Sequence, residues 1–418
     1  MTRMADVRID RLWQSSLMEA ISRRRSFRFG QGFEMTFGPW AGYRSKESPV
    51  PLTELETAIL CAVASGTTGV ISGDNIPLPT YPTYAGRTVP APCNMWSYAL
   101  FFVNEQGVFY YPPPEPTKQW EFESREDRDK ILQWFRQNTV KVADKFDVPL
   151  SYPALQSSNR WDAFRPGSTV FMIVAENISE LINGILLFST YEDRFKVIDD
   201  RTGKPAGCEK WIKSGWLTGP EAPLSTIEIM LCIGNGAVAG AMAQNMLLAM
   251  SAMGLGGYPF DGFTPIFVLG GTPLARGLGF RFTADKHGVP NPVGKDGVFE
   301  ALCPPYKRMD EAVDYVFEQK YGPEGSLSEE KRKIGPYKNF SEIRSKLETI
   351  PKEAIECTKA IVNYCYDTYG RFPVNYDTVM IPMAVQAHHP DFEFYDKHMS
   401  LPLPSAMHDH MKVWHEEQ

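Results

Sequence analysis

The chain has 418 residues, of which 43% are hydrophobic and 12% aromatic, and its formal net charge is −7 with both signs spread along the sequence. A chain of this length can bury a sizeable core, either as two ordinary domains or as one domain with insertions. The sequence has no long basic run to contact phosphates, so we expect no nucleic acid among its partners.

The first 27 residues contain no continuous apolar segment of the kind found in secretory signals. They predict instead an amphipathic helix with Leu12, Leu17, Met18 and Ile21 on one side. The seven cysteines are scattered and form no C-x-x-C pair, which is typical of free thiols in a reducing compartment. We therefore expect a cytoplasmic protein.

Apolar runs in the first half of the chain predict several strands. The runs SYALFFV, GVFYYPP and GSTVFMIVA, which begin at residues 97, 107 and 167, have the composition of strands. The segment 125–146 shows a helical period, with Ile131, Leu132, Phe135 and Val142 on one side. The linker PPPEPTKQW precedes this segment, and we interpret about 112–225 as an insertion.

The stretch 234–263, GNGAVAGAMAQNMLLAMSAMGLGGYPFDGF, admits three interpretations. A membrane span is disfavoured, because the stretch is rich in glycine, alanine and amides and poor in Leu, Ile, Phe and Val. A dinucleotide-binding turn at Gly234–Ala239 would follow the strand-like STIEIMLCI, but the next strand-like run, PIFVLGG, has no acidic residue at its end. The third is a helix from about Ala237 to Met253, apolar all round, buried in a core or across a subunit interface and ended by Gly254.

The residues that follow this helix carry a resemblance to a known family. The string A-x-A-Q-N-x-L-L-A-x-x-A-x-G-L-G at 241–256, followed by Y-P-F-D-G-F, resembles the nitroreductase-like flavoproteins. In that family a long central helix at the dimer interface runs into a P-x-E-G-F loop, and here Asp261 replaces the Glu. The segment 22–29, SRRRSFRF, is similar to the family's N-terminal R-R-S-x-R-x-F, and the two motifs occur in the family's order.

A third, looser similarity lies at 87–94. The sequence RTVPAPCN, followed by two predicted strands, is similar to R-T-x-P-S-A-G in the branch that contains the peptide azoline dehydrogenases. Ala91, Pro92 and Cys93 replace the small polar residues of that pattern. Together the three similarities cover about 100 of the 418 residues.

The resemblance implies a nitroreductase-like α+β fold. It has a central, mostly antiparallel sheet flanked by helices and a long buried helix at the dimer interface. On this basis we expect a single domain with the insertion at about 112–225 and a helical C-terminal extension at about 322–418. The family also implies an obligate homodimer with FMN bound between the subunits.

The same resemblance assigns candidate contacts to FMN. The N-terminal cations and a serine hydroxyl would hold the phosphate dianion, and Arg28 would stabilise the negative charge of reduced flavin. A backbone N–H near Gly262 would face flavin N5, and a late basic loop would form a second phosphate clamp. The full set is Arg24, Arg25, Ser26, Arg28, Cys93, Asn94, Pro259, Phe260, Asp261, Gly262, Lys307 and Arg308.

Each of these groups also has an ordinary structural interpretation. Three consecutive arginines occur at solvated helix ends, Asp-Gly is a common turn, and Lys307 and Arg308 suit a surface turn. We name no catalytic proton donor, because the cofactor itself carries the chemistry of such enzymes.

The C-terminal tail contains six of the seven histidines, namely His388, His389, His398, His408, His410 and His415. Metal binding is one interpretation of such a cluster. The spacings match no known site and no cysteine is near, so we expect no metal ion and interpret the tail as an arm that wraps the partner subunit.

The sequence therefore predicts an FMN-dependent oxidoreductase. It would pass a hydride from NAD(P)H to an activated alkene, a quinone or a nitroaromatic compound, or oxidise a small molecule in the reverse direction. Two alternatives stay open. One is a non-catalytic protein on the same fold, with or without flavin, and the other is an NAD-dependent dehydrogenase that uses Gly234–Ala239.

Overall fold

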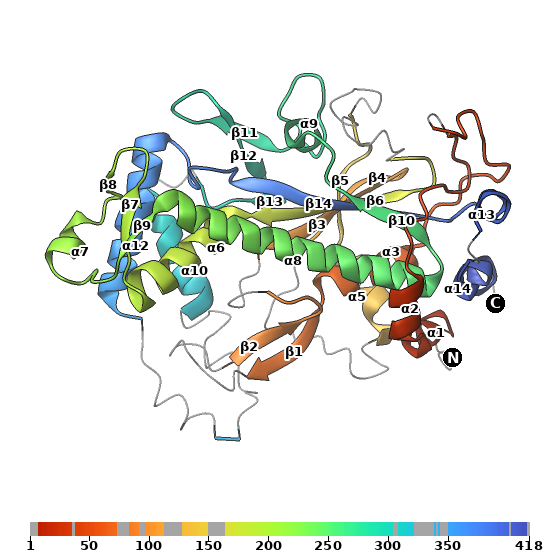
Figure 1. Cartoon of the computed structure of the whole chain (residues 1–418), viewed down its shortest axis with the longest axis horizontal. Helices are drawn as coiled ribbons and strands as arrows, with labels where there is room; N and C mark the ends of the chain where they lie inside the picture. The colour runs from red at the N-terminus through yellow and green to blue at the C-terminus, as the bar shows by residue number, and fades with distance from the viewer. Residues whose placement is uncertain are drawn as a thin grey trace.

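A six-stranded sheet lies at the centre of the computed structural model (Figure 1). Its strands, in spatial order, are β10 (Gly256–Phe260), β14 (Val379–His388), β6 (Thr169–Glu176), β3 (Tyr98–Asn104), β4 (Gly107–Tyr111) and β5 (Val140–Ala143). All neighbouring strands are antiparallel. The structure describes residues 7–35, 38–72, 83–91, 97–112, 128–148, 164–303, 308–321, 338–339, 342, 350–400 and 403–415.

Helices flank this sheet, and smaller sheets lie around it (Figure 1). The helices are α1 (Val7–Gln14), α2 (Leu17–Arg23), α3 (Glu54–Ser65), α5 (Ile131–Asn138), α6 (Asn177–Gly184) with the π-helical continuation η3 (Ile185–Glu192), α7 (Glu209–Lys213), α8 (Leu224–Met253), α9 (Pro265–Leu269), α10 (Asp310–Tyr321), α12 (Lys352–Tyr369), α13 (Phe392–His398), α14 (Ser405–His408) and α15 (His410–Trp414). The small sheets pair β1 (Thr67–Ser72) with β2 (Thr83–Arg87), β12 (Pro290–Lys295) with β11 (Arg281–Ala284) and β13 (Phe299–Glu300), and β7 (Lys196–Asp199) with β8 (Lys204–Pro205) and β9 (Glu221–Pro223). The predicted α+β class with an antiparallel sheet flanked by helices is therefore confirmed.

The two central strands are buried on both faces, which explains their continuous apolar sequences. Along β3, Phe101 packs into a core with α6, α10 and α12, whereas Phe102 packs into a second core with α3, α5 and α8. Met172 and Ile173 of β6 divide between the same two cores. The alternation of side chains along each strand thus separates two helical layers.

The predicted strands at 97–103, 107–113 and 167–175 appear as β3, β4 and β6. The range 112–225, expected as an insertion, contributes β5 and β6 to the central sheet, and the range 322–418, expected as an extension, contributes β14. The helical period over 125–146 is only partly realised, because Val142 lies in β5, which pairs with β4.

The single amphipathic helix expected at the N-terminus is wrong. It is two helices, because Ser16 caps the start of α2 by accepting a hydrogen bond from the Glu19 N–H. Leu17, Met18 and Ile21 are exposed.

Helix α8 is longer than expected, because it begins at Leu224 rather than near Ala237. The run STIEIMLCI is therefore helical and not a strand. Within it, Glu228 accepts hydrogen bonds from the backbone N–H groups of Val374 and Asn375, both at 2.8 Å, and this tertiary contact outweighs the local preference of the run. The run PIFVLGG is also not a strand and forms α9 instead.

These corrections remove the dinucleotide-binding interpretation. Gly234 and Gly236 lie in the middle of α8, not in a turn between a strand and a helix. The predicted end of the helix is confirmed, because Gly254 caps it in the left-handed conformation with φ of 91°.

By length and composition α8 is long and apolar enough to cross a membrane, and it is the one such helix among the residues that the structure describes. Its C-terminal half packs in the core with Val238, Met242 and Met246. Its N-terminal half is different, because Met230 and Ile233 are 67% and 66% exposed.

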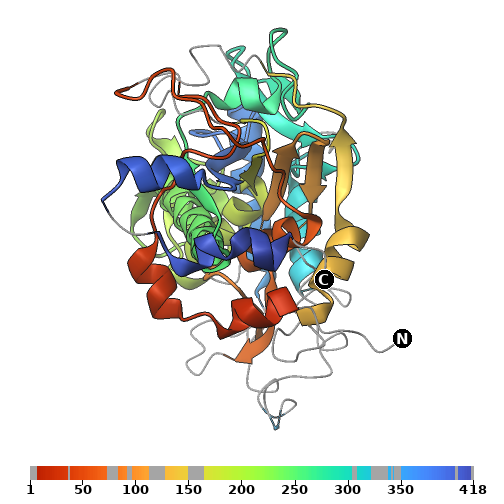
Figure 2. The same ribbon diagram turned by 90° about the vertical axis from the view of Figure 1, so that its right-hand side faces the viewer.

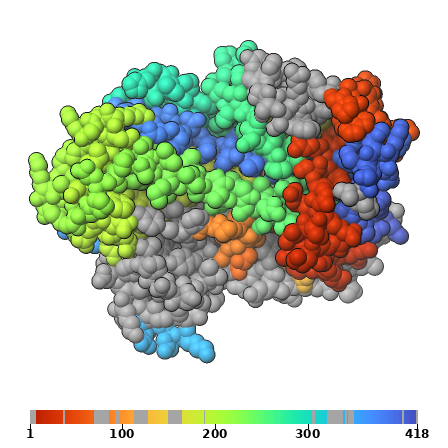
Figure 3. All heavy atoms as spheres, viewed as in Figure 1, coloured from red at the N-terminus to blue at the C-terminus, as the bar shows by residue number. Residues whose placement is uncertain are grey.

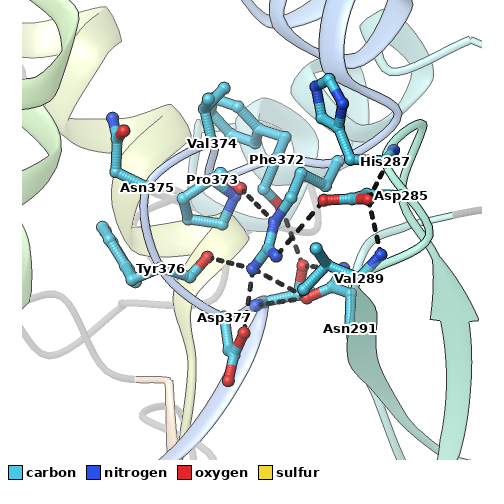
Figure 4. A network of polar contacts seen from close by, with 12 residues as sticks. Asp285, His287, Val289, Asn291, Phe372, Pro373, Val374, Asn375, Tyr376 and Asp377 are labelled. Carbon is cyan, nitrogen blue, oxygen red and sulfur yellow. Dashed lines mark hydrogen bonds and ion pairs between the residues drawn. The ribbon is translucent and has the colours of Figure 1, made fainter.

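A network of polar contacts holds the loop between α12 and β14 (Figure 4). Arg371, which is buried, takes part in it. Its guanidinium donates to the carbonyl oxygens of Pro373 and Tyr376 and to the side-chain oxygen of Asn291, at 3.2, 2.7 and 3.3 Å. Asn291 also accepts from the backbone N–H of Thr378 at 3.0 Å. One buried cation thus ties the start of β14 to β12.

We expect Arg371→Met to lower the free energy of unfolding by about 2–3 kcal/mol, because it leaves buried acceptors without donors while it keeps much of the side-chain volume. Urea denaturation would measure this change. Arg44→Met is the control, because the Arg44 side chain is 73% exposed and only pairs with Glu34. Equal midpoints for wild type and Arg371→Met would contradict the prediction.

Candidate functional site

The end of α8 and the arginine-rich segment after α2 lie next to each other. The guanidinium carbon of Arg28 lies 4.7 Å from the centre of the Tyr258 ring in β10. A Cβ atom at Gly256 would lie 2.9 Å from the carbonyl oxygen of Phe27, so a glycine permits this close approach. The fold therefore brings together the two sequence motifs that carry the family resemblance.

Two tyrosines lie near the guanidinium of Arg28 and affect its pKa. Burial lowers the pKa of Arg28 from its ordinary value, while Tyr258 and Tyr395 oppose that shift. The Tyr395 hydroxyl accepts a hydrogen bond from the Phe29 N–H at 2.8 Å, and its ring packs edge-on against Phe27. Sequence reasoning missed both tyrosines, because only the fold of α13 against this segment brings Tyr395 near.

The other cations of the motif lie closer to solvent. Arg25 is exposed and donates to the carbonyl oxygens of Ser22 and Arg24 at 3.2 and 2.8 Å, so it caps the C-terminal end of α2. Arg24 is half-buried and Ser26 is exposed. No carboxylate among the described residues forms an ion pair with Arg24 or Arg25.

The loop after β10 presents aromatic side chains and a turn. Phe260, the last residue of β10, lies 5.6 Å from the Tyr258 ring and 5.9 Å from the Phe263 ring. The Phe263 N–H donates to the Asp261 carbonyl at 2.8 Å, which closes a tight turn at Gly262. Half-buried Pro259 precedes this turn.

Among the remaining predicted contacts, Arg308 does not join this group within one chain. Arg308 is exposed and lies 3.4 Å from Asp310, the first residue of α10. Helix α10 lies at the far end of the molecule from α2 (Figure 1). Cys93, Asn94 and Lys307 lie outside the described residues.

One surface cavity lies beside the end of α2, and another lies over the central sheet. One of 250 Å³ is enclosed by α1, α2, the end of α8 and the C-terminal helices, and Arg23, Ser251 and Asp409 line it. Another of 530 Å³ lies over the sheet, where Phe102, Phe109 and other residues line it. Neither cavity is lined by Arg24, Arg28 or the 259–262 turn.

The C-terminal helices fold back onto their own chain, beside α1 and α2 (Figure 2). The tail histidines take three kinds of position. His388 is fully buried, and burial lowers its pKa to about 3, so it is neutral. His408 stacks on Phe392, and His398 packs against Phe394 with the two rings tilted. The remaining three, His389, His410 and His415, converge on Glu56. The spacing of the histidines in the sequence did not predict this grouping.

Similarity to known proteins is found among solved structures. No family model matches the chain, and no curated protein sequence matches it. Among solved structures, a protein from Ralstonia eutropha JMP134 described as "a putative nitroreductase" is 15% identical, with a TM-score of 0.27. The match covers 60% of this chain and 72% of that one.

Proposed function

We propose that the chain is an FMN-dependent oxidoreductase of the nitroreductase type. The observation that carries the proposal is the contact between Arg28 and Tyr258, which joins the N-terminal cationic motif to the segment that follows α8. The two motifs are more than 200 residues apart in the sequence. Their proximity in space supports a shared role for them.

The donor set at this position fits an anionic cofactor. Arg24, Arg25 and Arg28 lie within one short segment, and the Ser26 hydroxyl is exposed beside them. Guanidinium groups and hydroxyls are suitable donors for a phosphate. Arg24 and Arg25 have no carboxylate partner among the described residues, so a phosphate dianion would supply the missing negative charge.

Each group has a distinct role in this proposal. Arg24, Arg25 and Ser26 would bind the phosphate, and Arg28, held by Tyr258, would face the charge of the reduced ring. The turn at Asp261–Gly262 would present a backbone N–H, because a glycine permits close approach. When bound, FMN would accept and return a hydride. The chain's own contribution is to bind, orient and exclude water.

The exposed face of α8 supports a homodimer. Ile229, Met230 and Ile233 are exposed, and Cβ atoms added at Gly236 and Gly240 would meet open space. Figure 3 shows α8, in green, across the surface of this face. A patch of large apolar side chains next to small residues is typical of a protein interface. A second copy of the chain would bury it and place a cofactor between the subunits.

We propose a cytoplasmic enzyme that takes its hydride from NAD(P)H and reduces an activated alkene, a quinone or a nitroaromatic compound, or that oxidises a small molecule in reverse. The absorption spectrum of the purified protein and of its heat-released supernatant tests the cofactor. A released chromophore that matches FMN supports the proposal. A colourless protein that takes up no added FMN contradicts it.

We expect Arg28→Ala to raise the dissociation constant for FMN by roughly 10- to 100-fold, because a hydrogen bond to a charged group contributes about 1.5–3 kcal/mol. Fluorescence titration of apoprotein with FMN would measure the constant. Arg136→Ala is the control, because Arg136 is exposed and pairs with Glu54. Unchanged binding by a folded Arg28→Ala protein would rule out this role for Arg28.

We expect Met230→Asp combined with Ile233→Asp to convert a dimer into a chain of 47.1 kDa in light scattering coupled to gel filtration. Charges in the interface would be buried without partners on association. Leu274→Asp is the matched control, because Leu274 is also an exposed apolar residue, at 64%, but lies away from α8. A wild-type protein that is monomeric, or a double variant that stays dimeric, would contradict the assignment of this face.

A further inference from the structure

Four side chains from three distant segments meet at one buried point. Glu56 comes from the first turn of α3, His389 follows β14, and His410 and His415 lie at the two ends of α15. One potential ligand atom of each lies within 4.8 Å of all the others. Glu56, His389 and His410 are buried, and His415 is 15% exposed at its side chain.

The carboxylate of Glu56 is divided between two tasks. Its Oε2 atom accepts hydrogen bonds from the Thr53 N–H at 2.6 Å and the Thr53 hydroxyl at 2.9 Å, as part of the capping box of α3. Its Oε1 atom faces the histidines, at 2.7 Å from His410 Nε2, 3.2 Å from His415 Nε2 and 3.5 Å from His389 Nε2. The cap therefore fixes the orientation in which Oε1 meets the rings.

Backbone carbonyls orient two of the imidazoles. His389 Nδ1 lies 2.8 Å from the Val50 carbonyl oxygen, and His410 Nδ1 lies 2.8 Å from that of Met253. A carbonyl accepts only, so each Nδ1 carries a proton, and in the neutral form of each ring Nε2 directs a lone pair at the cluster. This arrangement, in which the second ring nitrogen donates to a carbonyl, is usual for histidines that bind metals.

With neutral rings, these contacts place two hydrogen-bond acceptors against each other at the centre of the cluster. A neutral His410 would direct a lone pair at a carboxylate oxygen only 2.7 Å away, and His410 Nε2 has no well-aligned hydrogen-bond partner among the described residues. His389 Nε2 and His415 Nε2 lie 3.0 Å apart and share a hydrogen bond when His415 carries its proton on Nε2. A positive charge between Glu56 Oε1 and His410 Nε2 would turn their repulsion into attraction.

We propose that Glu56, His389, His410 and His415 bind one divalent transition-metal ion, with zinc the best match. Zinc accepts imidazole nitrogen and carboxylate oxygen at about 2.0–2.2 Å in a tetrahedron, which places neighbouring ligand atoms about 3.3 Å apart. The contacts of Oε1 to the rings, from 2.7 to 3.5 Å, bracket this spacing. Three neutral imidazoles and one carboxylate suit zinc better than calcium or magnesium, which prefer oxygen.

The ion would have a structural role. All four positions of a tetrahedron are taken by protein atoms, as in structural zinc sites, and no open position remains for a substrate. Since His410 begins α15 and His415 directly follows it, the ion would fasten α15 to α3 and to the end of β14. The less buried His415 marks the side from which an ion would enter.

The test is the metal content of the full-length protein, purified without a histidine tag and supplied with zinc. We expect about one zinc per chain in elemental analysis, as for a closed structural site. A chelator should lower the melting temperature, and added Zn²⁺ should restore it. A protein that contains no metal, and whose melting temperature does not respond to Zn²⁺, would overturn the proposal.

Variants assign the ligands. Glu56→Gln and His415→Gln keep side-chain size and should each lose the zinc, whereas His408→Gln should retain it, because His408 is exposed two residues before His410. If either variant does not fold, Co²⁺ added to wild-type apoprotein gives a second readout. Tetrahedral visible bands with nitrogen ligation support the site, and an octahedral spectrum like that of aqueous Co²⁺ contradicts it. Zinc lost equally from His408→Gln would also contradict the assignment.

Discussion

The position of β14 determines how the rest of the molecule is assembled. This strand lies near the end of the chain, yet it pairs with β10 on one side and with β6 on the other. The central sheet is therefore complete only after the C-terminal part has docked. Such a pairing joins residues of large sequence separation, so the entropy of loop closure must be offset by the burial of both faces of the sheet.

Two buried carboxylates illustrate how the chain fastens its distant segments. Glu228 accepts from neutral amides of the loop before β14, and burial raises its pKa. Glu56 is equally buried, but its pKa shifts in the opposite direction because its neighbours are imidazoles, which can carry or coordinate positive charge. The contrast shows that burial alone does not decide the state of a carboxyl group. The donors around it do.

The sequence predicted those elements that depend on their own residues, and it failed where an element depends on contacts with residues far along the chain. β3 and β6 were predictable, because strands buried on both faces have long apolar runs, and Gly254 was predictable as a helix end. β4 was predictable from its valine and aromatic residues. The run 225–233 was not, because Glu228 makes its decisive contacts with residues near 374. A local pattern cannot register a partner that lies so far along the chain.

The candidate site was predictable in part for the same reason. The motif at 22–29 and the turn at 259–262 are contiguous in sequence and can be recognised one at a time. Tyr395 and the partners of Glu56 are single residues that only the fold brings together. The sequence shows that the tail is rich in histidine, but only the tertiary structure shows which three of the six histidines meet at Glu56.

The candidate cofactor residues and the metal cluster share one backbone segment. The Gln31 N–H donates to the His389 carbonyl at 2.9 Å, Asp391 N–H donates to the Phe29 carbonyl at 3.2 Å, and Gly30 bridges Pro390. The segment that carries Arg28 is therefore held by the same residues that present His389 to Glu56. An ion at Glu56 would restrain the backbone next to Arg28 without touching a cofactor. The two sites use different side chains, so either can exist without the other. The backbone of the segment 27–31 nevertheless contacts the residues around both sites.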